Sequence, residues 1–479
     1  MSRYARLFVL AFLACADPHR GTSDTANTTP PPVVQNGHDW TRFNYDQART
    51  GTSTADVGLT ATNIPTMKRQ QVAIDGVVDA SAIYLNNIPV NGAAHDVFFV
   101  TTEYGKTLAV DANDGTILWR FTPPNYASWA GSARITNVTP VADPDRTAIY
   151  SASPDGNIEK LAVSDGHAVW TTSITSLASR EKIASPLNLS QGHVIATTGG
   201  YIGDAPSYQG HVSILDASTG QLLHSWNSLC SNRTGLIDPT SCAQSGSAIW
   251  GRAGAVVDAN GNIFVATGNG QWDGVTNWGD AIIELDPLAT RMLANYTPTN
   301  TANLDASDAD VGSTSPVLLD ATHVVQGGKD GAFRVVNLQT VGGTTAHKGG
   351  ESQSVSNPGG GSMFTAPAVY HQTGGETWVF AATGSGTAAW TYSSGRLTAA
   401  WSNGNSGTSP IVAGGLLYVF DPGGTLRVYD PATGNQVASL TCGGGHWNSP
   451  IVADGRIALP EGSANSHSSS GVLNIWRLP

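Results

Sequence analysis

A repeat of about fifty residues constrains this chain more than any other feature of its sequence. When residues 98–119 are aligned on residues 149–170, glycines and a tryptophan coincide at a constant offset of 51 residues: Gly105 on Gly156, Gly115 on Gly166 and Trp119 on Trp170. Each copy reads as two alternating strands around a glycine turn, followed by a second turn and a third strand. Weaker copies follow along the chain, which makes eight units in all.

A short strand precedes most units and is marked by a proline or a small residue, as at Pro140, Pro316 and Pro450. Four short strands per period predict an all-β fold, an eight-bladed β-propeller with four-stranded antiparallel blades. The last unit supplies only three strands, whereas residues 67–74 precede the first inner strand and have no unit of their own. This N-terminal strand is therefore predicted to close the last blade.

Composition narrows the class of protein further. The chain has 479 residues, of which 13% are charged, and a formal net charge of −12. A coiled coil or a charged disordered chain needs far more charge than this. Nucleic-acid binding relies on clustered Lys and Arg, so the acidic balance argues against it. Beyond the first fourteen residues, no apolar run approaches the roughly 20 residues that span a bilayer.

The N-terminus has the character of an export signal. Arg3 and Arg6 precede an apolar stretch at residues 7–14, and two processing routes fit: a lipoprotein box with lipidation at Cys15, or an A-x-A cleavage site. Residues 1–15 are thus expected to be a signal peptide and residues 16–37 a Thr/Pro-rich disordered tether. The propeller would occupy residues 38–479. We expect an exported protein that is periplasmic, anchored to the outer membrane by a lipid, or extracellular.

Three cysteines remain beyond Cys15. Cys230 and Cys242 lie twelve positions apart in a Ser/Gly/Asn-rich stretch, where an oxidising compartment favours a loop-closing disulfide. Cys442 is then left as a free thiol. The chain contains no C-x-x-C-H motif for covalent attachment of a c-type haem.

The spacing of Ala109, Asp111, Gly115 and Trp119 resembles the tryptophan-docking motif of quinoprotein propellers, in which it locks one blade to the next. Residues 40–51 are similar to the N-terminal signature of that family. The resemblance therefore spans residues 40–479 and implies the same eight-bladed fold. Kelch and WD-repeat propellers are alternatives, but they lack this Gly-to-Trp spacing.

Strand order determines which face of such a ring carries the site. With strands A to D counted outward, the B-to-C turns and the D-to-A connections emerge on one face. The longest irregular segments are assigned to these two kinds of connection: residues 199–210, 227–250, 270–279, 298–312 and 341–363. Functional loops concentrate where a rigid scaffold tolerates extra length, so the site is expected on this face.

Segments on that face are similar to those that carry the cofactor in quinoprotein alcohol dehydrogenases. By this resemblance, Asn269 is a calcium ligand, Asp310 is the catalytic base and a metal ligand, and Lys329 contacts the quinone carbonyl. Trp250 would stack under pyrroloquinoline quinone (PQQ). Only Asp204 stands where the family has a glutamate metal ligand.

The resemblance implies a chemistry that suits these residue types. Calcium takes six to eight oxygen ligands, of which Asn269, Asp310 and Asp204 could supply three. Asp310 could accept the proton of an alcohol while hydride passes to the quinone. Two departures from the family are visible, because Gln209 replaces an expected Arg and the vicinal cysteine pair is missing. Each residue also has an ordinary interpretation, such as a turn cap for Asn269 or a solvated side chain for Lys329.

These features favour a PQQ- and calcium-dependent alcohol or sugar dehydrogenase with a small hydroxyl substrate and a separate electron acceptor. One alternative is a non-catalytic lipoprotein scaffold that binds protein partners, like the propeller of the outer-membrane assembly machinery. Another is a carbohydrate- or surface-binding module that uses exposed aromatic residues: Trp272, Trp278, Tyr208 and Trp447. His446 and Trp447 are expected to pack across the central channel.

Overall fold

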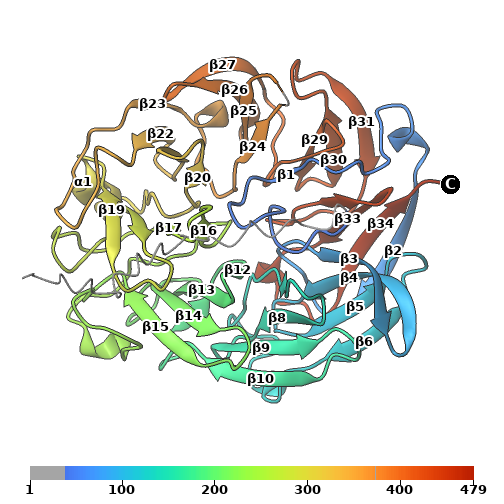
Figure 1. Cartoon of the computed structure of the whole chain (residues 1–479), viewed down its shortest axis with the longest axis horizontal. Helices are drawn as coiled ribbons and strands as arrows, with labels where there is room; N and C mark the ends of the chain where they lie inside the picture. The colour runs from blue at the N-terminus through green and yellow to red at the C-terminus, as the bar shows by residue number, and fades with distance from the viewer. Residues whose placement is uncertain (1–37, 373) are drawn as a thin grey trace, which may run out of the picture. The chain divides into compact units, whose positions relative to one another are not determined.

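The computed structural model describes residues 38–372 and 374–479, whose strands form eight sheets around a ring (Figure 1). The predicted signal peptide with Cys15 and the predicted tether lie outside the described residues and stay predictions. In the described part, helix is confined to one α-helix and five short 3₁₀ helices: α1 (Thr301–Ala306), η1 (Ile64–Thr66), η2 (Tyr126–Ser128), η3 (Pro239–Ser241), η4 (Pro358–Gly360) and η5 (Ala464–Ser466). None of these helices is long and apolar enough to cross a membrane.

Each sheet contains one antiparallel blade whose strands are counted from the inside outward. Blades 1 and 2 contain β3 (Ile83–Val90), β4 (Ala93–Thr101), β5 (Thr107–Asp111) and β6 (Ile117–Phe121), then β7 (Val141–Ala142), β8 (Ala148–Ala152), β9 (Asn157–Ala162) and β10 (Ala168–Ser173). Blades 3 and 4 contain β11 (Glu181–Ile183), β12 (Asn188–Ser190), β13 (His193–Gly200), β14 (His211–Asp216) and β15 (Leu222–Asn227), then β16 (Val256–Val257), β17 (Ile263–Ala266), β18 (Ile282–Leu285) and β19 (Met292–Tyr296).

The second half of the ring repeats this pattern. Blades 5 and 6 contain β20 (Val317–Leu318), β21 (His323–Gln326), β22 (Ala332–Asn337) and β23 (Gln353–Ser356), then β24 (Ala368–His371), β25 (Thr377–Thr383), β26 (Gly386–Ser393) and β27 (Arg396–Asn403). Blades 7 and 8 contain β28 (Ile411–Ala413), β29 (Leu416–Asp421), β30 (Thr425–Tyr429) and β31 (Gln436–Thr441), then β32 (Ile451–Ala453), β33 (Arg456–Glu461) and β34 (Gly471–Arg477). The predicted all-β, eight-bladed propeller is confirmed.

The last blade is closed by a strand from the beginning of the described chain. Strand β2 (Lys68–Ile74) pairs antiparallel with β34 over its whole length, from Lys68 opposite Arg477 to Ile74 opposite Gly471. Its apolar residues Val72 and Ile74 are buried in the same core cluster as Leu473. Because strands from the two ends of the propeller pair in one sheet, blade 8 has four strands and the ring is closed. The predicted closure by residues 67–74 is confirmed.

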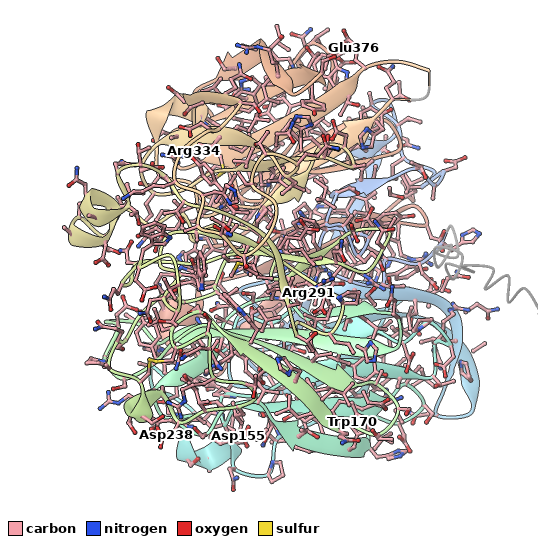
Figure 2. The ribbon with its side chains drawn as sticks, turned by 60° about the vertical axis from the view of Figure 1, so that its left-hand side comes forward. Asp155, Trp170, Asp238, Arg291, Arg334 and Glu376 are labelled. Atoms are coloured by element: carbon pink, nitrogen blue, oxygen red, sulfur yellow. A yellow bond between two sulfur atoms is a disulfide. The ribbon has the colours of Figure 1, made fainter. Side chains whose placement is uncertain are left out.

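Tryptophans at the start of outer strands dock onto glycines of the following blade. The Trp119 indole N–H donates to the Val163 carbonyl at 2.8 Å, and its ring covers Gly166, where a Cβ would lie 2.5 Å from Trp119 Cε3. Trp170, at the rim of the ring in Figure 2, covers Gly220 in the same way. Only glycine fits under these rings, which explains why the repeat preserves both residue types.

One loop was assigned to the wrong face. Residues 341–363 were predicted to be a D-to-A connection, but they contain β23, the outer strand of blade 5. Residues 338–352 therefore connect strand C to strand D and emerge on the opposite face. They pair there with the outer edge of blade 4, where Asn295 donates its backbone N–H to the Val341 carbonyl at 3.0 Å. This loop covers an edge strand that would otherwise be exposed.

Residues 40–57, called the strap below, run along the inner strands of several blades. Backbone N–H groups of inner-strand residues donate to strap carbonyls: Ala142 to Thr41, Val257 to Gln47, Val369 to Thr50 and Val412 to Gly51. Strand β1 (Thr52–Ser53), within the strap, pairs parallel with β28. Phe43 is fully buried. The strap thus ties together strands that are far apart along the chain.

The cysteines form the predicted pairing. Cys230 and Cys242 are joined by a disulfide with a Cα–Cα distance of 6.2 Å, within the connection from blade 3 to blade 4. Cys442 is a free thiol.

Candidate functional site

A cavity of about 220 Å³ lies among the loops of one face of the ring. Most of its lining residues belong to B-to-C turns and blade-to-blade connections: Asn137, Lys182, Ala184, Gly200, Tyr201, Ile202, Asp204, Trp250, Arg252, Ser313, Lys329, Phe364, Trp447 and Asn465. This is the face on which strand order predicted a site. We call this space the central cavity.

Lys329 occupies the turn that follows β21, at the wall of the central cavity. Its backbone N–H donates to the Asp310 carbonyl at 2.9 Å, which fixes this turn to the connection between blades 4 and 5. Its Nζ lies 3.2 Å from Asp310 Oδ2 and 2.7 Å from Asp308 Oδ1. The same Nζ is 5.4 Å from the centre of the Trp250 ring. Three residues singled out from sequence, Trp250, Asp310 and Lys329, are therefore neighbours.

The Asp310 carboxylate has no exposed surface, and its Oδ1 has no hydrogen-bond partner. Burial raises the pKa of Asp310 to about 6, although the charge of Lys329 acts in the opposite direction. A buried acceptor without a partner costs about 1–3 kcal/mol, so native structures contain few of them. An oxygen in this condition is suited to receive a proton, a donor group or a metal ion from a ligand.

Asn269 lies beside Asp310 and presents a second oxygen of this kind. Its Nδ2 donates to Asp308 Oδ1 at 2.9 Å, whereas its Oδ1 is buried and has no partner. A Cβ on the preceding Gly268 would lie 3.4 Å from both Asp310 Oδ2 and Trp250 Nε1, so this backbone passes close to both side chains. The absence of a side chain at Gly268 leaves the space between them.

The predicted calcium ligands are brought together only in part. Asp204 lines the central cavity but accepts a hydrogen bond from the Tyr208 hydroxyl at 3.1 Å. Among residues 38–372 and 374–479, no three His, Cys, Asp or Glu side chains are grouped closely enough to hold a metal ion. Asn269 and Asp310 offer unpartnered oxygens, far fewer than the six to eight that calcium takes. A quinone and water would have to supply the others.

Two cationic residues that sequence reasoning did not single out also line the central cavity. Lys182, on β11, contacts the Asn137 side-chain oxygen, and burial lowers its pKa to about 8. Arg252 donates to the Asp79 carbonyl at 2.6 Å, while its Nε has no partner. With Lys329, three basic side chains line a space whose lining contains one carboxylate, Asp204. Carboxylates just behind the lining, Asp308 and Asp310 at Lys329 and Asp79 near Arg252, offset part of this charge.

Asp280 is a second buried acid, and no motif in the sequence singled it out. Its Oδ1 accepts from the Val311 N–H at 3.1 Å, and its Oδ2 has no partner. Burial raises the pKa of Asp280 to about 8, and the nearby Asp310 charge adds to the shift. A protonated Asp280 fixes the backbone next to Asp310 without competing for Lys329.

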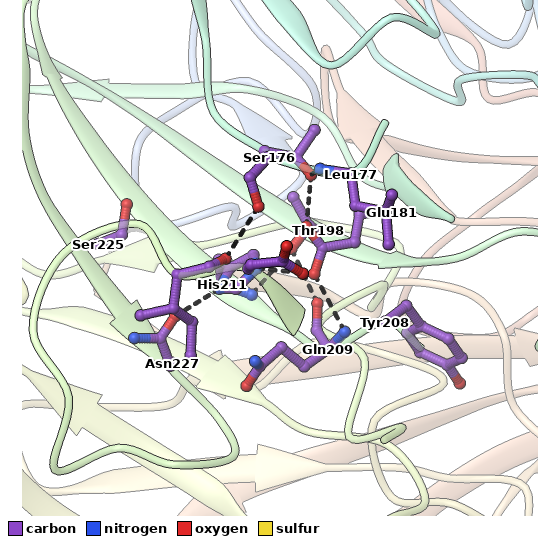
Figure 3. A network of polar contacts seen from close by, with 12 residues as sticks. Ser176, Leu177, Glu181, Thr198, Tyr208, Gln209, His211, Ser225 and Asn227 are labelled. Atoms are coloured by element: carbon purple, nitrogen blue, oxygen red, sulfur yellow. Dashed lines mark hydrogen bonds and ion pairs between the residues drawn. The ribbon is translucent and has the colours of Figure 1, made fainter. Parts of the chain in front are cut away.

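Gln209 lies in a buried polar network in blade 3 (Figure 3). It stands where the family resemblance led us to expect an Arg. Glu181 Oε1 accepts from the Gln209 N–H at 3.2 Å and lies 2.8 Å from His211 Nε2. His211 Nδ1 lies 2.6 Å from Asn227 Oδ1. Neither polar atom of the Gln209 side chain has a partner. The network anchors the end of the loop that carries Asp204.

The predicted packing of His446 and Trp447 across the central channel agrees with their contacts. Their rings stack with centres 4.0 Å apart, and Trp447 also stacks with Phe364 at 6.2 Å. His446 Nδ1 lies 2.7 Å from Asp79 Oδ2, which joins the connection between blades 7 and 8 to the start of blade 1. Arg252 lies 5.5 Å from the centre of the Trp447 ring.

Comparison with solved structures places the fold among quinoprotein propellers. The quinohemoprotein alcohol dehydrogenase from Comamonas testosteroni superposes with a TM-score of 0.70 at 16% identity, over 92% of this chain and 81% of that chain. A europium-containing methanol dehydrogenase gives 0.66 at 15% identity, over 93% and 99%. BamB from Moraxella catarrhalis gives 0.53 at 14% identity, over 86% and 98%. These identities establish a shared fold alone.

Sequence comparison agrees with this result. Quinohemoprotein alcohol dehydrogenase ADH IIB from Pseudomonas putida is 29% identical over 129 residues, which is 27% of this chain but only 18% of that relative. A family model described as outer membrane protein assembly factor BamB matches residues 47–281 and 297–467, and so most of the chain. The chain therefore belongs to this family of PQQ-like propellers, as the resemblance in its repeats implied.

Proposed function

We propose that this propeller is a quinoprotein dehydrogenase that oxidises a hydroxyl-bearing substrate, with PQQ held in the central cavity. One observation carries the proposal: the fully buried Asp310 carboxylate lies 3.2 Å from Lys329 at the cavity wall and keeps an oxygen without a partner. A carboxylate in this state costs stability unless a ligand uses it. Its use would be that of a general base.

The chemistry of the cavity walls suits such a cofactor. PQQ is a planar aromatic quinone that carries carboxylates, and when bound it supplies the oxidant that takes up hydride. Lys182, Arg252 and Lys329 would balance its negative charge, and Trp250 offers an aromatic surface. The indole N–H of Trp250 and the Nε of Arg252 both lack partners, so the walls retain donors for a ligand.

Asp310 would accept the hydroxyl proton as the substrate is oxidised. With a pKa near 6 it is mostly ionised at neutral pH, yet it is close enough to that pH to be an effective base. Burial alone would lower the pKa of Lys329, but Asp310 and Asp308 more than offset this and raise it. Because Asp310 has no exposed surface, a substrate hydroxyl reaches it only after neighbouring groups shift.

Calcium is the less complete part of the proposal. Asn269 and Asp310 would contribute their unpartnered oxygens, and Asp204 could join them only by leaving the Tyr208 hydroxyl. We therefore expect weak calcium affinity, so reconstitution should need excess calcium. Electrons would leave through a separate acceptor. An exported location, with or without a lipid at Cys15, remains part of this proposal.

Reconstitution tests the function directly. Alcohol-dependent reduction of an artificial dye should require both PQQ and Ca²⁺. Asp310→Asn should abolish turnover but spare quinone binding, because asparagine keeps the shape and a side-chain oxygen but cannot act as a base, whereas Lys329→Ala should weaken both. If calorimetry detects no PQQ binding at any calcium concentration, the dehydrogenase proposal is wrong. A protein-binding scaffold would then be the better account of this propeller.

A further inference from the structure

A second cavity, of about 480 Å³, lies beside the central cavity over blades 6, 7 and 8. Phe364 and Trp447 line both spaces, so these two rings form a shared wall. The remaining lining comes from the connections on either side of blade 6, from the B-to-C turns of blades 6 and 7, and from His446. Its volume falls within the range of about 300–1,000 Å³ typical of small-molecule sites. We call it the lateral cavity.

The charges around the lateral cavity exclude two classes of ligand. No Lys or Arg belongs to its lining, and its one histidine, His446, already faces the Asp79 carboxylate at 2.7 Å, so no unpaired cation there would balance an anion. Asp421 is its one carboxylate, and that charge is already neutralised by Arg427 Nη1 at 2.6 Å. A single paired carboxylate does not make a cation site. The lateral cavity is thus suited to an uncharged ligand, in contrast to the central cavity, whose lining includes three basic side chains.

The hydroxyl groups of the lining determine which hydrogen bonds remain available. Five of the six lining hydroxyls already donate to a protein oxygen: Ser362 to Lys329 O, Thr365 to Ala382 O, Thr383 to Pro358 O, Ser406 to Asp421 Oδ1, and Thr408 to Asn448 O. A hydroxyl that has donated its proton keeps lone pairs that accept. The sixth hydroxyl, on Ser385, can still donate or accept. The walls therefore present mainly acceptors, and the complementary ligand is one that donates several hydrogen bonds.

Aromatic rings complete the lining. His446, Trp447 and Phe364 stack in a row and are each partly exposed. Such rings offer apolar surface next to polar groups. A sugar or polyol combines these requirements, since it is uncharged, donates hydrogen bonds from many hydroxyls and presents C–H groups between them.

From this geometry we infer that the lateral cavity binds an uncharged saccharide or polyol. Phe364 and Trp447 separate this cavity from Lys329 and Trp250, which line the central cavity alone. The inferred binding is therefore independent of the proposed function.

Gly384 offers a way to block the lateral cavity without disturbing the fold. It lines the cavity in the turn between β25 and β26, and a Cβ added there would have no heavy atom within 4 Å. Gly384→Phe should therefore occupy the cavity from an exposed turn. Gly404→Phe is the matched control, since Gly404 is also exposed with open space at Cβ but does not line either cavity.

The test is calorimetric titration of the full chain without cofactor, using maltose, sorbitol, gluconate and glucosamine as probes. Maltose or sorbitol should bind to wild type and to Gly404→Phe with similar affinity. The affinity of the same probe for Gly384→Phe should be lower by about tenfold or more. Gluconate and glucosamine should bind less well than sorbitol. The inference is overturned if neither uncharged probe binds at millimolar concentration, if only the amine binds, or if Gly384→Phe binds as wild type does.

Parallel titration with PQQ separates this inference from the proposed function. Gly384→Phe should retain any PQQ binding that wild type shows, because the central cavity is unchanged. Saccharide binding without PQQ binding would contradict the dehydrogenase proposal and support the lateral cavity as a saccharide site. PQQ binding without saccharide binding would support the dehydrogenase proposal and contradict the saccharide site.

Discussion

Replacing Glu159 with glutamine should make the protein more stable at neutral pH. Glu159 lies on β9 and is 1% exposed, its Oε2 has no partner, and Ser153 is the contact of its Oε1. Burial raises the pKa of this carboxyl from 4.5 to about 8. At pH 7 the folded protein must therefore keep a proton that the unfolded chain has released.

The sign and size of the effect follow from these two pKa values. Between pH 4.5 and about 8, the folded state binds more protons than the unfolded state, so the free energy of unfolding falls as pH rises. The slope is about 1.4 kcal/mol per pH unit, which amounts to about 3 kcal/mol at pH 7. Below pH 4.5 the penalty is absent, and above pH 8 it no longer grows. Glutamine keeps the shape and an acceptor for Ser153 but has no proton to lose.

Melting temperatures from pH 4.5 to pH 8.5 provide the assay. Glu159→Gln should match wild type at pH 4.5 and melt about 3 °C higher at pH 7, given the melting entropy of a propeller of this size. Glu376→Gln, on the exposed hairpin between β24 and β25 (Figure 2), is the control and should leave the pH dependence unchanged. An unchanged pH slope in Glu159→Gln, or a lower melting temperature at pH 7, would refute the reasoning.

The remaining predictions concern the ring and its connections. Deleting residues 1–37 should leave the melting temperature unchanged, whereas deleting residues 1–58 should lower it through loss of the strap. Deleting residues 1–76 should lower it further, because blade 8 then lacks β2. Equal melting curves for the three deletion variants would contradict the closure of the ring by β2. Cys242→Ser should lower the free energy of unfolding by about 3 kcal/mol, and non-reducing peptide mapping should find no linkage to Cys442. Gly220→Ala should destabilise by about 1–3 kcal/mol as judged by denaturant unfolding, because its Cβ would lie 2.6 Å from Trp170 Cδ2. Gly192→Ala has a similar positive φ but open space around it, so it should cost less if blade docking matters.

The ring could be predicted from sequence because its rules are local. Gly166 and Trp119 recur at fixed spacing since each blade must dock onto the next, and the missing strand of the last unit pointed to residues 67–74. Strand β23 was missed for an equally local reason. Gln353–Ser356 is an outer strand without fully buried residues, so its sequence lacks the apolar alternation that marks the inner strands.

The candidate site was predictable only where its residues follow the repeat. Trp250, Asp310 and Lys329 occupy connections whose face is set by strand order, so the sequence could group them. Arg252 donates to the backbone carbonyl of Asp79, 173 residues away along the chain, and the sequence around neither residue indicates this contact. Lys182 is one of only six lysines, and this scarcity favours a special role. However, the sequence of the strand that contains Lys182 does not indicate that its side chain lines a cavity.

The strap supports one of the basic side chains that line the central cavity. The Arg252 guanidinium lies 5.8 Å from the Phe43 ring of the strap and 5.5 Å from the Trp447 ring at the cavity wall. Phe43 has no exposed surface, so the strap shields its side of Arg252 from solvent. A cation that is shielded from water acts more strongly on an anion. If PQQ binds as proposed, the deletion of residues 1–58 should therefore weaken PQQ binding more than the deletion of residues 1–37.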